Sequence, residues 1–394
     1  MAEHSVKKRI MLIDAMNLIH RSYYAYPRLT AKTGEHTGAL FGFVQYLKSL
    51  QKKYSPDHMI ICSDTSRKSF RTDIYPAYKG TRTETDAELI SQFAYMETYL
   101  EKCSATFIKL ENYEADDLIG TLAVQAAERG YAPYIVSGDR DLFQMVTHEI
   151  KQIYLSTKEG MVEVGPEEVV QKYDGLAPEQ MIDLKALMGD ASDNIPGIRG
   201  VGEKTAIKLL TQFGTLEGIY KNTDQLKGKL KEKVENGKAD AYLSKWLATI
   251  DREVDLDLDV LLEPHPHFSL CTKDAYDFLN MLGITRIYKQ EDIYQVPEPV
   301  VSECGLDLPF EVVETTTGDL SFRCIDKYQG EVSKEGLGMY VYSLLLETKN
   351  RKPLISMLKK AEEDLLQSSV LNEDEIEKLK AGHHALVSFL ENDC

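Results

Sequence analysis

Short apolar runs alternate with longer amphipathic stretches over about the first 165 residues. The apolar runs predict strands at residues 10–13, 59–63, 105–108, 133–137 and 152–155. Between them, apolar positions at helical spacing predict helices over about 17–25, 38–53, 86–102 and 116–129, the last ended by Gly130. This alternation is typical of an α/β fold in which helices cover a parallel sheet.

The pattern becomes helical from about residue 166 to residue 290, with helix starts after Gly165-Pro166 and Ala177-Pro178. Pro297 and Pro299 then indicate a linker. Mixed elements follow at 310–313 and 339–346, and a charged helical end covers 351–392. We therefore predict three parts: an α/β core over 1–175, a helical region over 176–295, and a C-terminal extension over 296–394 to which the sequence assigns no role.

The composition fits a globular chain of 394 residues, with 43% hydrophobic and 28% charged residues. Asp14 and Asn17 interrupt the apolar run that follows the basic start, which argues against a signal peptide. No apolar run approaches the ~18 residues of a membrane span, so we expect a cytoplasmic protein with no membrane partner. The six cysteines lie far apart and without CxxC pairs, which favours reduced thiols over zinc ligands.

The net charge of −17 seems unfavourable for a partner rich in phosphate. Residues 301–394, however, hold 18 acidic and 10 basic residues, so much of the excess lies in the extension. The positions of the remaining acids are more informative than their number.

Acidic residues follow several of the predicted strands. Asp14 ends the first apolar run and Asp64 follows the second, and the carboxyl ends of parallel strands form the ligand crevice of an open sheet. Others begin the helix near 116, follow the fourth strand, or lie in the helical region. The complete set is Asp14, Asp64, Glu114, Asp116, Asp117, Asp139, Asp141, Asp190 and Asp193.

Each acidic group also has a structural explanation as a helix-dipole partner, an N-cap or a polar turn. Those explanations do not account for acids from several strand ends meeting at one edge. Two carboxylates ~6 Å apart repel by about 3 kcal/mol at an effective dielectric of ~20, so such a cluster requires cations. Oxygen ligands without histidine or cysteine favour Mg²⁺ or Mn²⁺, and two such ions suit an in-line phosphoryl displacement.

Two further segments carry features of nucleic-acid binding. Between Asp64 and the next helix, basic and aromatic side chains alternate, which suits phosphates and unpaired bases, although a solvated loop has the same composition. Glycines at 197, 200 and 202 precede a helix, where backbone amides can approach a phosphate beside Lys204. Their spacing is neither that of a P-loop nor that of a dinucleotide site.

These residues resemble the 5′ nucleases, which comprise the 5′–3′ exonuclease domain of bacterial DNA polymerase I and the related flap endonucleases. The resemblance covers about residues 9–290, with signatures in family order at 14–21, 75–82, 113–117, 138–141 and 189–197. It implies a PIN-like or resolvase-like nuclease core, then a helical domain with a helix–three-turn–helix element. It also implies hydrolysis of DNA that carries 5′ ends or flaps.

The resemblance implies individual roles as well. One metal site draws on Asp14, Asp64, Glu114 and Asp116, and the other on Asp139, Asp141, Asp190 and Asp193, with Asp116 bridging and Asp117 supporting. Two Mg²⁺ ions are expected, with Mn²⁺ as a substitute, and a K⁺ ion is implied at the carbonyls of the helix–three-turn–helix. With Asp116, the catalytic set contains Lys79 and Arg82 of a helical arch over about 67–85. The implied DNA contacts are Arg21, Arg67, Arg71, Tyr78, Lys79, Arg82, Lys185, Arg199, Gly200, Gly202, Lys204 and Thr205.

The extension departs from the pattern, because polymerase I continues for several hundred residues and only about a hundred follow here. We therefore expect a stand-alone nuclease. Two alternatives stay open: a DNA-structure-binding protein that no longer cleaves, and a ribonuclease that acts on RNA–DNA hybrids. All nine acids are present, which favours a competent nuclease.

Overall fold

The computed structural model describes residues 7–27, 29–32, 34–65, 68–262, 268–294, 310–314 and 320–324. The chain divides into two compact units, Met1–Tyr294 and Gln295–Cys394. In the second unit, β7 (Phe310–Glu314) pairs antiparallel with β8 (Leu320–Cys324). The elements predicted at 339–346 and 351–392 lie outside the described residues.

The first unit contains a six-stranded sheet in the order β3-β2-β1-β4-β5-β6. Five strands are parallel, as predicted: β1 (Arg9–Asp14), β2 (His58–Cys62), β3 (Thr106–Ile108), β4 (Ala132–Ser137) and β5 (Lys151–Ser156). The sixth, β6 (Gly160–Val164), runs antiparallel at the edge and was not predicted. Because the carboxyl ends of the five parallel strands lie side by side, residues that follow β1, β2 and β4 share one edge of the sheet.

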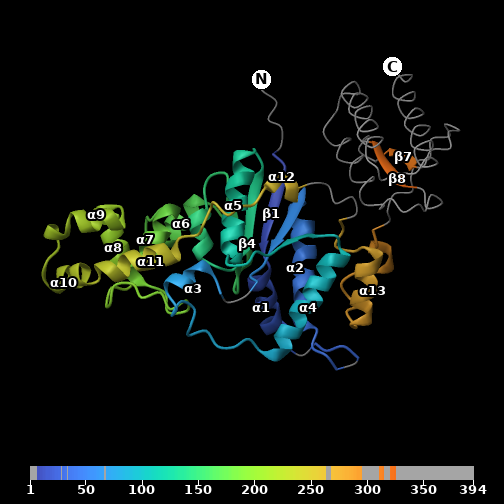
Figure 1. Ribbon diagram of the computed structural model, residues 1–394, viewed down its shortest axis with the longest axis horizontal. Helices are drawn as coiled ribbons and strands as arrows, with labels where there is room; N and C mark the ends of the chain where they lie inside the picture. Colours follow the sequence, from blue (N-terminus) through green and yellow to red (C-terminus); the bar gives the residue numbers. More distant parts are fainter. Residues whose placement is uncertain are drawn as a thin grey trace, which may run out of the picture. The chain divides into compact units, whose positions relative to one another are not determined.

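Helices cover both faces of the sheet, since successive side chains of a buried strand point to opposite sides. Met11 and Ile13 pack with α1 (Ala15–Ala25), α2 (Gly38–Tyr54), α4 (Ala87–Lys102) and α13 (Lys273–Met281). Ile10 and Leu12 pack with α5 (Ala115–Glu128) and α12 (Leu258–Leu261) on the other face. The ribbon diagram shows β1 and β4 between these layers (Figure 1).

The predicted helical region is present and has its own core. It contains α6 (Pro166–Lys172), α7 (Met181–Met188), α8 (Glu203–Phe213), α9 (Leu216–Lys221), α10 (Gly228–Asn236) and α11 (Lys238–Ala248), with short 3-10 turns at η2 (Pro178–Gln180) and η3 (Thr223–Gln225). Another such turn, η1 (Asp141–Met145), lies between β4 and β5. Helices α8 to α11 lie on one side of the sheet, and α13 lies beside α4 on the other (Figure 1).

The chain returns to the α/β core sooner than the predicted boundaries suggest. Ile250, Val254 and Leu258 belong to the core under α5, and Leu270 and Ile284 belong to the core with α2 and α4. The short turn η4 (Gln290–Asp292) follows. Residues after about 250 therefore complete the core rather than extend the helical region, because their apolar side chains bury against the sheet layers.

The segment expected to form a helical arch is mostly irregular. Within the described residues 68–86, the only helix is α3 (Phe70–Ile74), and turns follow it up to α4. Among all described residues, no helix has both the length and the apolarity needed to cross a membrane.

Candidate active site

The acids at the ends of β1 and β2 are tied to neighbouring elements. Asp14 caps α1 by accepting from the backbone N–H of Asn17 at 2.9 Å, and it also accepts from Ser137 Oγ at 2.8 Å. Asp64 accepts from the backbone N–H of Ala115 at 2.7 Å, at the start of α5. Both carboxylates are thereby fixed at the carboxyl edge of the sheet, as the strand pattern predicts.

The same edge is electrostatically unfavourable for carboxylates. Withdrawal from water raises the pKa of Asp14 to about 7, and repulsion from Asp64 and Asp139 adds to the shift. It also raises the pKa of Asp116 well above the ordinary value, with further contributions from Asp139 and Asp14. These four acids, which sequence reasoning assigned to two separate ligand sets, therefore lie near enough to repel one another.

Asp139 and Asp141 lie directly after β4. The backbone N–H of Asp141 donates to Asp139 Oδ1 at 2.8 Å, which folds this loop into the turn η1. Gln152 of β5 is fully buried and donates through Nε2 to the backbone oxygens of Ser137 at 3.1 Å and Asp139 at 2.6 Å. Sequence reasoning missed Gln152, although a glutamine among the apolar residues of a central strand is an available signal.

Lys185 of α7 lies between two of the predicted ligands. Its ammonium forms ion pairs with both Asp141 and Asp190. Withdrawal from water raises the pKa of Asp141 to about 7 despite this contact. The three side chains line a pocket of about 380 Å³ together with Asn17, Asp139 and Asp193.

Asp193 contacts the two positively charged residues that the resemblance assigns to the catalytic set. Arg82 Nη2 lies 2.5 Å from Asp193 Oδ1, and the backbone N–H of Lys79 donates to the backbone oxygen of Asp193 at 2.8 Å. Lys79 adopts a left-handed backbone with φ +52°, a strained conformation of the kind often found at functional sites. Burial opposes protonation of Lys79, but the carboxylates of Glu114 and Asp193 outweigh it and raise its pKa.

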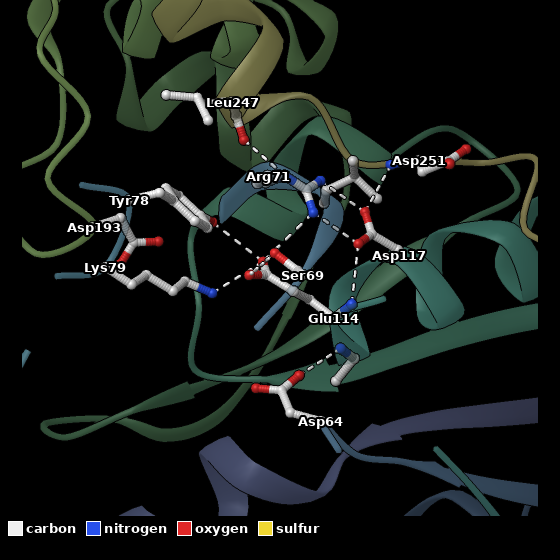
Figure 2. A network of polar contacts seen from close by, with 12 residues as sticks. Asp64, Ser69, Arg71, Tyr78, Lys79, Glu114, Asp117, Asp193, Leu247 and Asp251 are labelled. Carbon is white, nitrogen blue, oxygen red and sulfur yellow. Dashed lines mark hydrogen bonds and ion pairs between the residues drawn. The ribbon is translucent and has the colours of Figure 1, made fainter. Parts of the chain in front are cut away.

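Glu114 is the meeting point of several side chains at the start of α5 (Figure 2). Its Oε2 lies 2.9 Å from Lys79 Nζ and accepts from the Tyr78 hydroxyl at 3.1 Å. Ser69 Oγ donates to Oε1 at 3.2 Å. Tyr78 is only 5% exposed, so its ring is not available to stack on a base, and its assignment to DNA contact does not agree with the structure.

Asp117 and Arg71 also differ from their predicted roles. Asp117 is fully buried, and both its oxygens accept from the Arg71 guanidinium at 2.7 Å, so it is not placed to bind a metal. Arg71 is 2% exposed and cannot reach a phosphate from inside the protein. The two residues satisfy each other because an unpaired charge in this position is strongly unfavourable.

The glycine-rich segment joins α7 to α8 as a compact turn. Gly197 has φ +59°, and a β-carbon built there would lie 2.2 Å from the backbone nitrogen of Gly189. The backbone N–H of Gly197 donates to Ser244 Oγ of α11 at 2.8 Å. Lys233 Nζ donates to the carbonyl oxygen of Gly200 at 2.9 Å, which places an ammonium where the resemblance implies a K⁺ ion.

The other predicted DNA contacts are spread over two elements. Arg199, Gly200, Gly202 and Lys204 are exposed around the start of α8, and Thr205 is half-buried there. Arg21 of α1 donates through Nε to the Tyr46 hydroxyl at 3.0 Å. Arg67 lies outside the described residues.

In the part of the chain that the structure describes, no three His, Cys, Asp or Glu side chains are placed closely enough to hold one ion as they stand. Basic side chains, chiefly Lys185 and Lys79, lie among the acids instead. The donor set is nevertheless made of oxygens, and the raised pKa of Asp14 shows that added positive charge would relieve the site. The residues therefore fit hard divalent cations.

Comparison with known proteins identifies the family. Residues 9–174 match the family model described as 5′–3′ exonuclease, N-terminal resolvase-like domain, and residues 176–264 match the one described as 5′–3′ exonuclease, C-terminal SAM fold. The chain belongs to the 5′–3′ exonuclease family and is a nuclease.

Relatives from bacteria carry the name DNA polymerase I. That of Bacillus caldotenax is 42% identical over 259 residues, which cover 65% of this chain and 29% of the relative. That of Lactococcus lactis subsp. cremoris is 32% identical over 363 residues, which cover 89% of this chain and 39% of the relative. From the sequence we had expected the similarity to cover only about residues 9–290. The second match extends past Tyr294, so similarity to polymerase I is not confined to the first unit.

A solved structure of T5 5′-exonuclease with bound divalent metal ions (zinc) shares the fold. The TM-score is 0.54 at 24% identity, over 70% of this chain and 100% of that one. The PIN-like or resolvase-like core followed by a helical region is thus confirmed as the fold class.

Proposed function

We propose that this chain hydrolyses phosphodiester bonds of DNA that carries 5′ ends or flaps, with two Mg²⁺ ions bound at the carboxyl edge of the sheet. The observation that carries the proposal is the meeting of Asp14, Asp64, Asp116 and Asp139 at this edge, where withdrawal from water and mutual repulsion raise the pKa of Asp14 and Asp116. A set of carboxylates that is unfavourable alone is well suited to cations.

The proposed ligands are those that the resemblance to the 5′ nucleases implies, with one omission. Asp14, Asp64, Glu114 and Asp116 are assigned to one ion, and Asp139, Asp141, Asp190 and Asp193 to the other. Asp117 is left out because both its oxygens already pair with Arg71. When bound, such ions lower the pKa of an attacking water and stabilise charge on the attacking and leaving oxygens.

The positively charged side chains of the site are proposed to contact the substrate phosphate or to balance the acids. Lys79 and Arg82 hold positive charge beside Glu114 and Asp193, and both can exchange a carboxylate partner for a phosphate oxygen when substrate arrives. Positive groups already oriented toward the reacting phosphate require little rearrangement during the reaction. Lys185 balances Asp141 and Asp190 in the same way.

We assign the binding of duplex DNA to the turn between α7 and α8. The backbone amides at the start of α8, exposed beside Lys204, suit a phosphate. A flap endonuclease of the same fold, from T5, has been solved in complex with DNA and metal ions, which supports DNA as the partner. K⁺ is not part of the proposal, since Lys233 Nζ already bonds to the Gly200 carbonyl.

The test uses a duplex with a 5′-labelled flap, incubated with the protein and Mg²⁺. Short labelled products are expected with Mg²⁺ and none with excess chelator, and an Asp116→Asn preparation controls for contaminating nuclease. DNA that is retarded in a gel without products supports the non-cleaving alternative, and cleavage confined to a flap made of RNA supports the ribonuclease.

Independently of cleavage, Mg²⁺ should raise the melting temperature of the protein, because it relieves repulsion among the acids.

A further inference from the structure

Arg71 belongs to the basic segment that follows β2, but its side chain is buried. It lies in α3 and is 2% exposed, yet its guanidinium makes four strong hydrogen bonds. Two go to the carboxylate of Asp117, from Nη1 and Nη2, each at 2.7 Å. The other two go to the backbone oxygens of Leu247, from Nε at 2.9 Å, and Thr249, from Nη2 at 2.7 Å.

The two backbone oxygens belong to the end of α11, which stops at Ala248. The last carbonyls of a helix have no partner within the helix, and a cation at that end also suits the helix dipole. Arg71 satisfies two of these oxygens, and Gln144 Nε2 donates to a third, that of Ala248, at 2.9 Å. The end of α11 is thus held by side chains from α3 and η1.

The carboxylate of Asp117, which pairs with Arg71, also accepts two backbone hydrogen bonds. Its Oδ1 accepts from the backbone N–H of Asp251 at 2.8 Å, and its Oδ2 accepts from that of Glu114 at 3.1 Å. Figure 2 shows the pair between Leu247 and Asp251 on one side and Glu114 on the other. Three segments that are far apart in the sequence therefore meet at one buried ion pair.

The pair also touches the reactive region. Arg71 Nη1 lies 3.5 Å from Glu114 Oε2, the oxygen that contacts Lys79 Nζ at 2.9 Å. The opposite end of the connection leads to the glycine-rich turn, because Ser244 of α11 accepts from Gly197. Arg71 thus contacts the proposed ligand Glu114 directly. Through α11 it is also connected to the glycine-rich turn that is proposed to bind duplex DNA.

We propose that Arg71 is a positioning residue for DNA cleavage: paired with Asp117, it fixes Glu114, and through Glu114 the ammonium of Lys79, relative to the end of α11. This inference rests on the proposed function. A functional site requires its groups within about 0.5 Å of their working positions, and a buried bidentate ion pair provides that precision. Lysine cannot replace the planar guanidinium, because it offers a single nitrogen in place of three.

The first experiment compares Arg71→Lys and Arg71→Met with the wild type in single-turnover flap cleavage. We expect the rate to fall by about tenfold or more for Arg71→Lys while the dissociation constant of the flap changes less than about threefold. Arg129→Lys is the matched control, since Arg129, directly after α5, makes an ion pair at 3.0 Å with the exposed Asp259 of α12. That variant should retain the wild-type rate and affinity.

A second readout separates positioning from general loss of stability. If Arg71 acts through Glu114 and Lys79, Arg71→Lys should cost much less in a Lys79→Ala background than in the wild type. Equal factors in both backgrounds overturn the proposal. Hydrogen exchange of the Asp251 and Glu114 amides should also accelerate in Arg71→Lys, because both amides donate to Asp117.

Other outcomes are decisive as well. A wild-type rate in folded Arg71→Lys overturns the proposal, and so does weaker DNA binding at an unchanged rate, which identifies Arg71 as a DNA contact. If Arg71→Met does not fold, Arg71→Lys and the exchange measurement still decide. Failure of the wild type to cleave refutes the proposed function instead, and the exchange measurement then tests only the ion pair.

Discussion

Asp141 and Asp190 share the ammonium of Lys185, yet their pKa values move in opposite directions. Withdrawal from water and the neighbouring Asp139 raise the pKa of Asp141 to about 7. Burial also opposes ionisation of Asp190, but the bonds from Lys185 and from the backbone and hydroxyl of Ser192 lower its pKa to about 2. One lysine therefore does not neutralise both acids, and Asp141, whose pKa stays raised, still requires a cation.

Replacing Asp116 or Asp190 by alanine should nearly abolish flap cleavage. Loss of one ion removes several kcal/mol of transition-state stabilisation, and ~4 kcal/mol corresponds to about a thousandfold in rate. DNA affinity should stay within about tenfold, because phosphate contacts elsewhere are unchanged. Single-turnover rates and binding titrations of both variants measure the two quantities.

Asp259→Ala is the control for these substitutions, because it removes an exposed acid of α12 that forms an ion pair with Arg129 at the end of α5. It should cleave normally. Normal turnover by Asp116→Ala or Asp190→Ala would refute the assignment of that residue to a metal.

Lys79 and Lys204 should have separable effects. Lys79→Ala should reduce the single-turnover rate far more than duplex affinity, because its ammonium lies among the proposed ligands beside Glu114. Lys204→Ala should weaken duplex binding and reduce the salt dependence by about one phosphate contact, with little effect on the rate at saturation. The measurements are single-turnover rates and binding over a series of salt concentrations; equal effects of the two variants on both quantities would contradict this division.

The carboxylates at the strand ends could be predicted because a strand and the residue after it are local features of the sequence. The environment of each charge could not. Arg71 and Lys79 lie in the same basic segment, but only the fold places Arg71 inside against Asp117 and the end of α11. Gln144 and Gln152 were missed for the same reason, since their partners are backbone oxygens of distant residues.

At the scale of elements, strands buried on both faces were predictable and the antiparallel edge strand β6 was not. Strands β1 and β2 are continuous apolar runs, as expected where helices cover both faces of a sheet. Strand β6 is largely half-exposed, and its apolar residues Met161, Val162 and Val164 neither form a continuous run nor alternate with polar residues. Its pairing with β5 depends on the short turn between them, which leaves no periodic signal.

The turn between α7 and α8 gives a prediction at this scale. Gly197→Ala should lower the melting temperature by about 5 °C or more, because a new β-carbon meets the Gly189 backbone at 2.2 Å and φ is +59°. Gly202→Ala in the same turn is the control, since a β-carbon there has nothing within 4 Å. Thermal unfolding followed by circular dichroism decides, and equal melting temperatures for the two variants would show that the turn tolerates a shift.

Across the whole chain, the sequence pattern did not show where the helical region ends. The change to helical periodicity near residue 166 marks the helical region correctly, but nothing in the pattern after 250 shows that the chain returns to the sheet. The contacts show it: Tyr99 donates to the backbone oxygen of Leu270 at 2.6 Å, and Thr272 to that of Lys102 at 2.6 Å. A helix that packs on a helical core and one that packs on a sheet have the same amphipathic pattern.

This return leads to a prediction about truncation. A protein ending at Tyr294 should fold and cleave flapped DNA at close to the rate of the whole chain, because Met1–Tyr294 is a compact unit that contains every proposed ligand and DNA contact. A protein ending at Leu262 should be insoluble or unfolded, although it too keeps every proposed site residue. It lacks Leu270, Phe278, Ile284 and Ile293, which are buried against α2 and α4. Losing even one large buried side chain costs about 2–5 kcal/mol, so losing four exceeds the stability of an ordinary domain. Solubility, thermal unfolding and flap cleavage of the two truncated proteins test this; a well-folded, active protein ending at Leu262 would show that residues 268–294 are not part of the nuclease core.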